Sequence, residues 1–370
     1  MKPAGRPAGR RRPDAPAAID GRPATLADAL DRAAGLLGGA RLPLVVGRGL
    51  DVAAARAALA LAERLDGAFD PLDAGAGGAL AVLAEAGLLF VTPEEARRRA
   101  DLVVLVGDLS AATDWLAAVF PARDAPPRAV ALLGAGATAG RAIGGGTTTE
   151  RIAADAARLP ALVGALAALV GGRRVDTAAL GRPAAGLARL AERLRAARYA
   201  VIVWDAATLD ALSIETLAAT VKTLNLTTRA AALPVPAEAA AAIAAAGWTT
   251  GFAPPLRFRA GVPMHAPWAA DAARLAAAGE ADALVWIGAD SPPPALAGLP
   301  RVALTTAHDE GAAVSIAVAR PGRDHPAVIH DAVAGELVAV AASAPSSDRP
   351  TIAAVLDDLR TRIAGEMVPC

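Results

Sequence analysis

The chain has 370 residues, no net charge and 54% apolar residues, so it can bury a sizeable core, and two domains are expected. The balanced charge argues against a nucleic-acid-binding protein, which usually carries a basic excess. The single cysteine, Cys370, excludes an intramolecular disulfide framework, a cysteine-ligated iron–sulfur cluster and a CxxC zinc site.

The first 24 residues predict a disordered tail. They are rich in proline, carry the basic cluster Arg10-Arg11-Arg12 and offer little apolar surface to bury. The compact apolar stretch of a secretory signal is missing there. Elsewhere no run approaches the roughly 18 strongly apolar residues of a membrane span. These patterns predict a cytoplasmic protein that contacts no membrane.

From Thr25 onward, short apolar runs alternate with helical patterns. Thr25 is expected to cap a helix, and LPLVVG (42–47) ends in glycine, as buried parallel strands do. The remaining strands are expected at 101–108, 129–134, 199–205, 229–235, 282–290 and 301–306. This alternation predicts an α/β fold with two doubly wound, Rossmann-like parallel sheets. The expected domains are a first lobe over 25–165, a second lobe over 166–345 and a C-terminal helix over 346–370, with exchange of segments between the lobes left open.

Several patterns resemble ligand sites but fall short of them. GAGATAG (134–140) has one residue too many between its last glycines for the dinucleotide fingerprint G-x-G-x-x-G. The histidines lack the spacing of a protein-ligated metal. Three aspartates each follow an expected strand, where they can line a ligand crevice or cap the next helix, and capping is favoured. They are Asp108, Asp205 and Asp290.

Residues 248–268 differ from the alanine-rich remainder and are expected to form a long loop. Aromatic residues, prolines and glycines gather there, and long loops in compact domains are commonly functional or at an interface. The loop can line a pocket, with Arg257, Arg259 and His265 facing an anion. Alternatively, Trp248 and Trp268 can anchor a protein–protein contact. The arginines beside the aromatic anchors favour the interface.

Three motifs in this region resemble the B subunit of formylmethanofuran dehydrogenase. They are Trp248-Thr249-Thr250-Gly251-Phe252, then Arg259-Ala260-Gly261-Val262-Pro263, and then Gly279-Glu280-Ala281-Asp282-Ala283. The second motif carries an inserted alanine relative to the family pattern. The resemblance covers nearly the whole chain after the tail, and the order and spacing of the motifs make it specific.

The resemblance implies a molybdopterin-oxidoreductase fold, in which a tungsten or molybdenum pterin lies between α/β domains. In that family a cysteine or selenocysteine binds the metal, and an N-terminal cysteine cluster holds a four-iron centre. Here the N-terminal cysteines are absent, and the metal-ligand position falls near Gly75. A glycine cannot replace a thiolate ligand. The resemblance therefore implies a fold without the iron–sulfur domain, and a chain with no cofactor, no bound metal and no catalytic residues of its own.

This loss is the pattern of the B subunits of the formyltransferase/hydrolase complex of methylotrophic bacteria. That family implies a non-catalytic structural subunit, whose partners are a formyltransferase, an amidohydrolase and a C subunit. The complex converts formyl-tetrahydromethanopterin to formate through a methanofuran-like carrier in one-carbon metabolism. Two alternatives stay open, a tungsten or molybdenum dehydrogenase subunit and a small-molecule binder that uses the former cofactor cleft. Contacts to a partner or carrier are expected at Trp248, Arg257, Arg259, His265 and Trp268.

Overall fold

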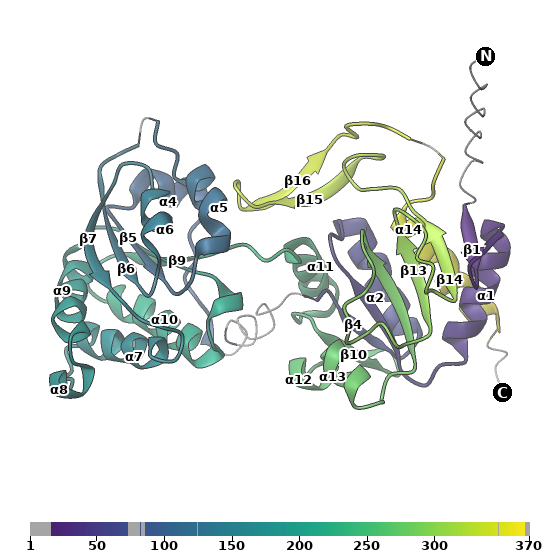
Figure 1. Ribbon diagram of the computed structural model, residues 1–370, viewed down its shortest axis with the longest axis horizontal. Coiled ribbons are helices and arrows are strands. Elements are labelled where there is room, and N and C mark those ends of the chain that lie inside the picture. Colours follow the sequence, from purple (N-terminus) through teal and green to yellow (C-terminus); the bar gives the residue numbers. More distant parts are fainter. Residues whose placement is uncertain (1–15, 73–81, 83–85, 124, 347, 367–370) are drawn as a thin grey trace, which may run out of the picture. The chain divides into compact units, whose positions relative to one another are not determined.

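A computed structural model describes residues 16–72, 82, 86–123, 125–346 and 348–366. The chain folds into two compact units (Figure 1). Unit 1 comprises residues 1–71, 256–327 and 340–370, and unit 2 comprises residues 72–255 and 328–339. The expected lobes 25–165 and 166–345 do not coincide with these units, because residues 25–71 share a sheet with strands that come after residue 256. The exchange of segments that the sequence left open is thus extensive.

Unit 1 is built on a nine-stranded sheet in the order β11-β10-β4-β3-β12-β13-β14-β1-β2. The middle strands are parallel, and both edges are antiparallel. The strands are β1 (Ala17–Ile19), β2 (Arg22–Ala24), β3 (Pro43–Gly47), β4 (Ala68–Asp70), β10 (Leu256–Arg259), β11 (Val262–His265), β12 (Ala283–Gly288), β13 (Arg301–Thr305) and β14 (Val314–Ala317). In Figure 1 the early, purple strands therefore lie among late, green ones.

Helices cover this sheet with alanine- and leucine-rich faces. They are α1 (Leu26–Gly38), α2 (Val52–Arg64), α12 (Pro267–Ala270), α13 (Ala272–Ala277) and α14 (Ile352–Glu366). Thr25 caps α1 as expected, since its hydroxyl accepts a hydrogen bond from Asp28 N at 3.1 Å. The C-terminal helix α14 packs against α1 and α2. Small alanine side chains allow this close packing of helices on the sheet.

The disordered tail predicted for residues 1–24 is wrong for residues 17–24. These residues form the paired strands β1 and β2, and β1 also pairs antiparallel with β14. Asp20 and Gly21 form the tight turn between them, with φ angles of 46° and 72°. Pro23 is tolerated because β2 is the edge strand. Asp20-Gly21 is a turn signal in the sequence, but the many prolines nearby favoured the prediction of a disordered tail.

Unit 2 is built on a parallel five-stranded sheet in the order β7-β6-β5-β8-β9. The strands are β5 (Leu102–Val106), β6 (Arg128–Leu133), β7 (Gly146–Ile152), β8 (Ala200–Trp204) and β9 (Ala230–Pro234). The helices are α4 (Pro93–Arg99), α5 (Thr113–Val119), α6 (Ala137–Arg141), α7 (Leu159–Val170), α8 (Thr177–Leu180), α9 (Pro183–Ala196), α10 (Ala211–Leu224) and α11 (Ala240–Thr250).

Both faces of this sheet are buried, which explains its continuously apolar strands. Along β5, Val104 packs in one core with α7, α9 and α10, whereas Val103 packs in a second core with α4, α5 and α6. Successive residues of a strand point to opposite faces, so a strand covered on both sides needs apolar residues throughout. The mixed α/β, doubly wound character predicted from the sequence is confirmed for this unit (Figure 1).

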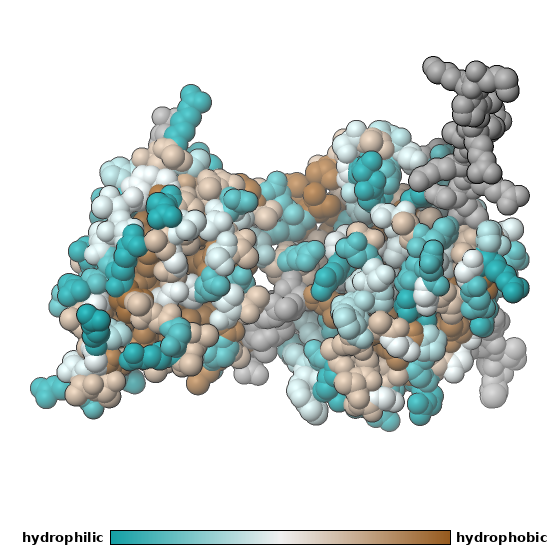
Figure 2. All heavy atoms as spheres, viewed as in Figure 1, coloured by the Kyte–Doolittle hydropathy of each residue, from teal (hydrophilic) through white to brown (hydrophobic). Residues whose placement is uncertain are grey.

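A two-stranded sheet completes the fold. It consists of β15 (Ala327–Asp331) and β16 (Glu336–Val340). Val328 and Val333 are about two-fifths exposed, at 39% and 40%. Figure 2 shows hydrophobic residues at the surface where Figure 1 places this hairpin. In the part of the chain that the structure describes, no helix is long and apolar enough to cross a membrane.

An ion pair between a buried glutamate and a solvent-exposed arginine makes the stability of unit 2 depend on pH. Glu150 of β7 is 9% exposed, and its carboxylate accepts two hydrogen bonds from Arg189 of α9, at 2.8 and 2.9 Å. The Arg189 hydrogen bonds lower the pKa of Glu150 against the opposing effect of burial, with smaller help from the charges of Arg189 and Arg193. A lowered folded-state pKa contributes stability above the unfolded pKa, and this stability is lost as the pH falls through the folded pKa.

We therefore expect the free energy of unfolding to fall between about pH 6 and about pH 3, and to fall less in Arg189→Met. Urea denaturation across this range measures both slopes. The Arg195→Met variant on the same helix is the control, because the Arg195 guanidinium donates a hydrogen bond to the Leu169 carbonyl and, among the described residues, pairs with no carboxylate. Equal slopes in Arg189→Met and the wild type would contradict the assignment.

Candidate functional site

The aromatic segment 248–268 is not the long loop predicted from the sequence. It comprises the end of α11, the hairpin β10–β11 and the short helix α12. Ala260 and Gly261 form the hairpin turn with φ angles of 51° and 74°, as two-residue turns between antiparallel strands require. The prolines and glycines that suggested a loop lie mostly at the ends of these short elements.

The two faces of the β10–β11 hairpin differ sharply. Leu256 and Phe258 are buried, at 0% and 3% exposure. On the opposite face, Arg257 pairs with Met264 and Arg259 pairs with Val262. Residues that lie opposite one another in an antiparallel pair share a face. Exposure of 61% for Val262 and 41% for Met264 shows that this arginine-flanked apolar face is uncovered in the chain.

Trp268 lies beside the hairpin and is held in place although 77% of it is exposed. The Arg274 guanidinium stacks on its ring at 4.6 Å and donates hydrogen bonds to the Trp268 and Ala269 carbonyls at 2.9 and 3.0 Å. Arg274 also pairs with Glu280 at 2.8 Å. This hydrogen bond is the main cause that lowers the pKa of Glu280. The helix α12, which carries Trp268, packs against β10.

We call the set Arg257, Arg259, Val262, Met264 and Trp268 the hairpin surface. It brings together three of the residues predicted from the sequence. His265 lies on the opposite face, paired with the buried Leu256, and is itself partly buried. Trp248 belongs to unit 2, where it is 68% exposed on α11. Met264 and Val262 were missed, although their alternation with the proline and histidine of β11 is a strand signal.

At the carboxyl edge of the unit 2 sheet, side chains of the chain itself pack close to the end of β5. The order in which the chain adds strands to the sheet reverses between β5 and β8, and α/β sheets commonly bind ligands at such a point. A Cβ added to Gly107 would lie 3.1 Å from Leu209 Cδ2 and 3.3 Å from Thr208 Oγ1. Asp108 and Asp205 accept backbone hydrogen bonds from residues two positions on, both at 2.9 Å. Asp205 therefore caps the short 3-10 helix Ala206–Thr208, as the sequence favoured, whereas Asp108 only turns the chain before the 3-10 helix Ser110–Ala112, whose N-cap is Leu109.

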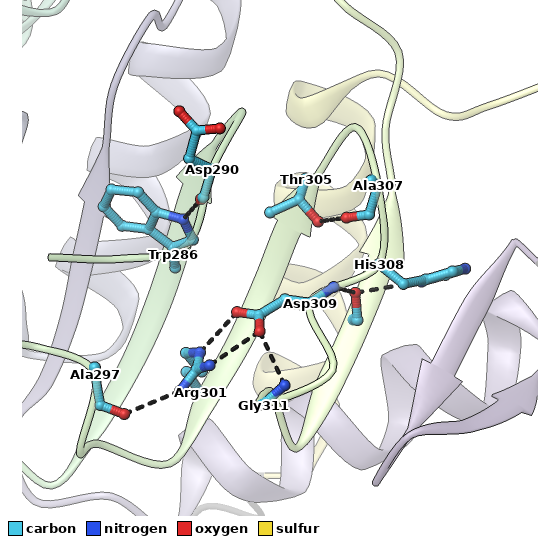
Figure 3. Close-up of polar contacts among 10 residues, drawn as sticks. Trp286, Asp290, Ala297, Arg301, Thr305, Ala307, His308, Asp309 and Gly311 are labelled. Carbon is cyan, nitrogen blue, oxygen red and sulfur yellow. Dashed lines mark hydrogen bonds and ion pairs between the residues drawn. The ribbon is translucent and has the colours of Figure 1, made fainter. Parts of the chain in front are cut away.

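At the corresponding edge of the unit 1 sheet, between β3 and β12, side chains also pack close to the end of β3. A Cβ on Gly47 would lie 3.1 Å from Leu50 Cδ1 and 3.2 Å from Ile287 Cβ. The Trp286 indole donates a hydrogen bond to the Asp290 carbonyl at 2.6 Å (Figure 3). After β12, Asp290 thus accepts this hydrogen bond with its backbone carbonyl, and its side chain, which the sequence favoured as a helix cap, is exposed.

The most enclosed charged pair in unit 1 joins Arg301 and Asp309 (Figure 3). Their side chains are 9% and 7% exposed, and two hydrogen bonds connect them at 2.8 and 3.0 Å. Arg301 also donates to the Ala297 carbonyl at 3.0 Å. The Arg301 hydrogen bonds lower the pKa of Asp309 despite its burial. The pair fixes the connection between β13 and β14 and is structural.

A pocket of about 340 Å³ lies in unit 2. Its lining is mostly apolar and comes from residues 90–93, from the end of β9 and from the β15–β16 hairpin. The lining residues are Phe90, Val91, Thr92, Pro93, Leu233, Pro234, Pro236, Ala240, His330 and Gly335.

The residues present do not fit a tungsten or molybdenum pterin. The metal-ligand position near Gly75 lies outside the described residues, and the sequence supplies no thiolate there. Across the described ranges, no group of three or more His, Cys, Asp or Glu residues is arranged to hold a metal ion. The side chains of Leu209 and Leu50 lie at the sheet edges described above. No chemical step through such a group follows from this chain.

Comparisons with known proteins give one consistent result. The chain is 34% identical over 365 residues to the Fhc B subunit of the formyltransferase/hydrolase complex of Methylorubrum extorquens strain AM1, covering 95% of this chain and 99% of that protein. It is also similar to a chain in the crystal structure of the M. extorquens formyltransferase/hydrolase complex (FhcABCD) with methylofuran. That similarity has a TM-score of 0.81 at 34% identity and covers 95% and 99% of the two chains. No protein-family model matches.

Proposed function

The chain belongs to the family of formyltransferase/hydrolase complex B subunits, and we propose that it is the non-catalytic structural subunit of such a complex. The main support for this proposal is the similarity in sequence and in structure between this chain and its M. extorquens relative, which extends along nearly the whole length of both. Its partners are then the formyltransferase, the amidohydrolase and the C subunit. The complex would convert formyl-tetrahydromethanopterin through a methanofuran-like carrier to formate, as the family resemblance implies.

A scaffold role is supported by the missing redox ligands and by the leucine side chains that lie at the edges of both sheets. Cys370 is its only cysteine, so the donor set for a pterin-bound metal is missing. The chain's own leucines lie at the carboxyl edges of both sheets. Analysis of the purified complex for tungsten and molybdenum discriminates a scaffold from a dehydrogenase, and stoichiometric metal in this chain would favour the dehydrogenase.

The fold is proposed to descend from the molybdopterin oxidoreductases without their iron–sulfur domain. Support comes from the doubly wound sheet of unit 2 and from the parallel strands at the centre of unit 1. The chain passes repeatedly between the two units. The two units would then correspond to the two expected lobes after an exchange of segments, with residues 25–71 moved into unit 1 and residues 166–255 moved into unit 2.

We propose that the hairpin surface contacts another subunit. Its exposed tryptophan is held by Arg274, so little side-chain freedom remains to be lost on binding. Tryptophan and arginine are the residue types that most often dominate interface energies. Trp248 and His265 are proposed as further contacts, each in its own unit. Contact with the carrier through Arg257 and Arg259 is the second proposal for the same residues.

Copurification tests the assignment. Full-length tagged chain, coexpressed with the three other subunits, is expected to retain all of them through size exclusion, because the B subunit is part of the complex. Mass spectrometry identifies the retained proteins. A control uses the same tag on an unrelated α/β protein. Recovery of the tagged chain as a stable monomer, free of formyltransferase and amidohydrolase, would contradict the proposal.

A further inference from the structure

The unit 2 pocket lies at the carboxyl edge of the unit 2 sheet, beside its outer strand β9. Residues 89–91 extend the sheet beyond β9, since Ala232 N donates to the Leu89 carbonyl at 2.8 Å and Val91 N donates to the Ala232 carbonyl at 3.0 Å. The two segments then leave the sheet together at its carboxyl edge, as Thr92-Pro93 and Pro234–Pro236. This edge is the ligand-binding edge of open α/β sheets.

The wall formed by the β15–β16 hairpin is firmly attached to this edge. Trp115 donates an indole hydrogen bond to the Ala332 carbonyl at 2.8 Å. Gly335 has a φ of 75°, and a Cβ there would lie only 2.5 Å from Pro93 Cδ. The Asp331 carboxylate accepts hydrogen bonds from Val333 N and Ala334 N at 2.8 and 2.9 Å, which orders the hairpin tip. The pocket is therefore formed before any ligand arrives, and little ordering cost opposes binding.

The lining determines which ligands suit the pocket. Phe90 lines the pocket and is half exposed. Prolines and aliphatic residues form most of the other lining. Of the lining residues, only His330 is titratable. Burial lowers the pKa of His330 and outweighs the neighbouring Asp331, so its imidazole is neutral near neutral pH. A neutral imidazole both donates and accepts hydrogen bonds.

We propose that this pocket binds a small, uncharged heteroaromatic ring, packed against Phe90 and hydrogen-bonded to His330. Its volume suits a single substituted ring, and its apolar walls disfavour a charged one. The site deepens the proposed function, because a methanofuran-like carrier contains a furan ring. Its biological ligand rests on that function, whereas its chemistry rests on the lining residues.

Binding of N-furfurylacetamide to the full-length chain tests the proposal. Saturation-transfer NMR is expected to show transfer to the furan protons, with a Kd on the order of 1 mM for so small a probe. Ala240→Phe fills the pocket and is expected to weaken binding at least ~10-fold. Ala244→Phe, one turn along α11 and outside the lining, is the matched control and should bind as the wild type does. N-ethylacetamide, which lacks the ring, should show no transfer.

A second variant guards against misfolding of the first. His330→Leu keeps an apolar wall and removes the directional hydrogen bond, so the expected loss is ~3- to 10-fold. Circular dichroism confirms that each variant is folded. No transfer to the furan protons in the folded wild type would overturn the proposal, as would unchanged binding in both Ala240→Phe and His330→Leu. Copurification of the subunits is read separately, so loss of ring binding with an intact complex rejects the pocket alone.

Discussion

Replacing Trp268 by alanine is expected to weaken binding of this chain to its partner subunits by about 2 kcal/mol or more, roughly 30-fold in Kd. The Trp268 side chain is 77% exposed in the chain and stacks on Arg274. It is therefore an ordered apolar side chain, most of which this chain leaves uncovered. An interface that buries it gains a large apolar area without a large entropy loss. Interferometry with the immobilised chain and the purified partner subunits measures this change.

Leu226→Ala is the matched control for Trp268→Ala. Leu226 is 82% exposed, but it lies in unit 2, just beyond the end of α10, and outside the hairpin surface. Its removal should leave Kd within about 2-fold, as isolated exposed apolar residues usually do. Equal Kd values for Trp268→Ala and the wild type would remove the hairpin surface from the interface.

The largest loss of stability is expected from Asp309→Ala, at about 3–5 kcal/mol. The variant leaves the guanidinium of Arg301 buried without its carboxylate partner, since the two side chains are 9% and 7% exposed. Breaking one side of a buried pair costs more than replacing both partners by apolar residues. The double variant Arg301→Met with Asp309→Leu should therefore be more stable than Asp309→Ala. Urea denaturation of each protein measures the difference.

The same pair predicts the direction of a pH effect. Because the pKa of Asp309 is lowered in the folded protein, the stability from the pair is present above the unfolded pKa. It is lost as the pH falls through the folded pKa. The difference in unfolding free energy between the wild type and the double variant should shift towards the double variant in acid. A difference that does not vary with pH would show that the pair contributes nothing through ionisation.

The strands at the centre of both sheets were predictable because they are buried on both faces. All five residues of β3, β5 and β8 are buried, and each strand appears in the sequence as an unbroken apolar run. In an α/β chain, a short continuous run that ends near a glycine or aspartate is typical of a buried parallel strand. The cap at Thr25 was predictable for a local reason, since a capping hydroxyl serves the next turn of its own helix.

Elements that depend on distant residues were not predictable in the same way. Strand β1 pairs with β14, which lies near the other end of the chain, so no local pattern announces it. The boundaries of the two units were not predictable for the same reason, since β3 lies beside β12. The Ala260-Gly261 turn carries a positive φ at a non-glycine residue, which hid the β10–β11 hairpin. The sequence therefore predicted Arg257, Arg259 and Trp268 as contact residues, but it did not predict the hairpin that places them.

Reconstitution with and without this chain tests most directly whether it is the structural subunit of the complex. The formyltransferase, the amidohydrolase and the C subunit are mixed, and the mass of the assembly and the release of formate are measured. We expect the complete assembly and full formate release only when this chain is present. No substitution in a catalytic subunit and no added metal should be needed for the assembly or for the release of formate. Assembly of the other subunits with undiminished formate release in its absence would contradict the account.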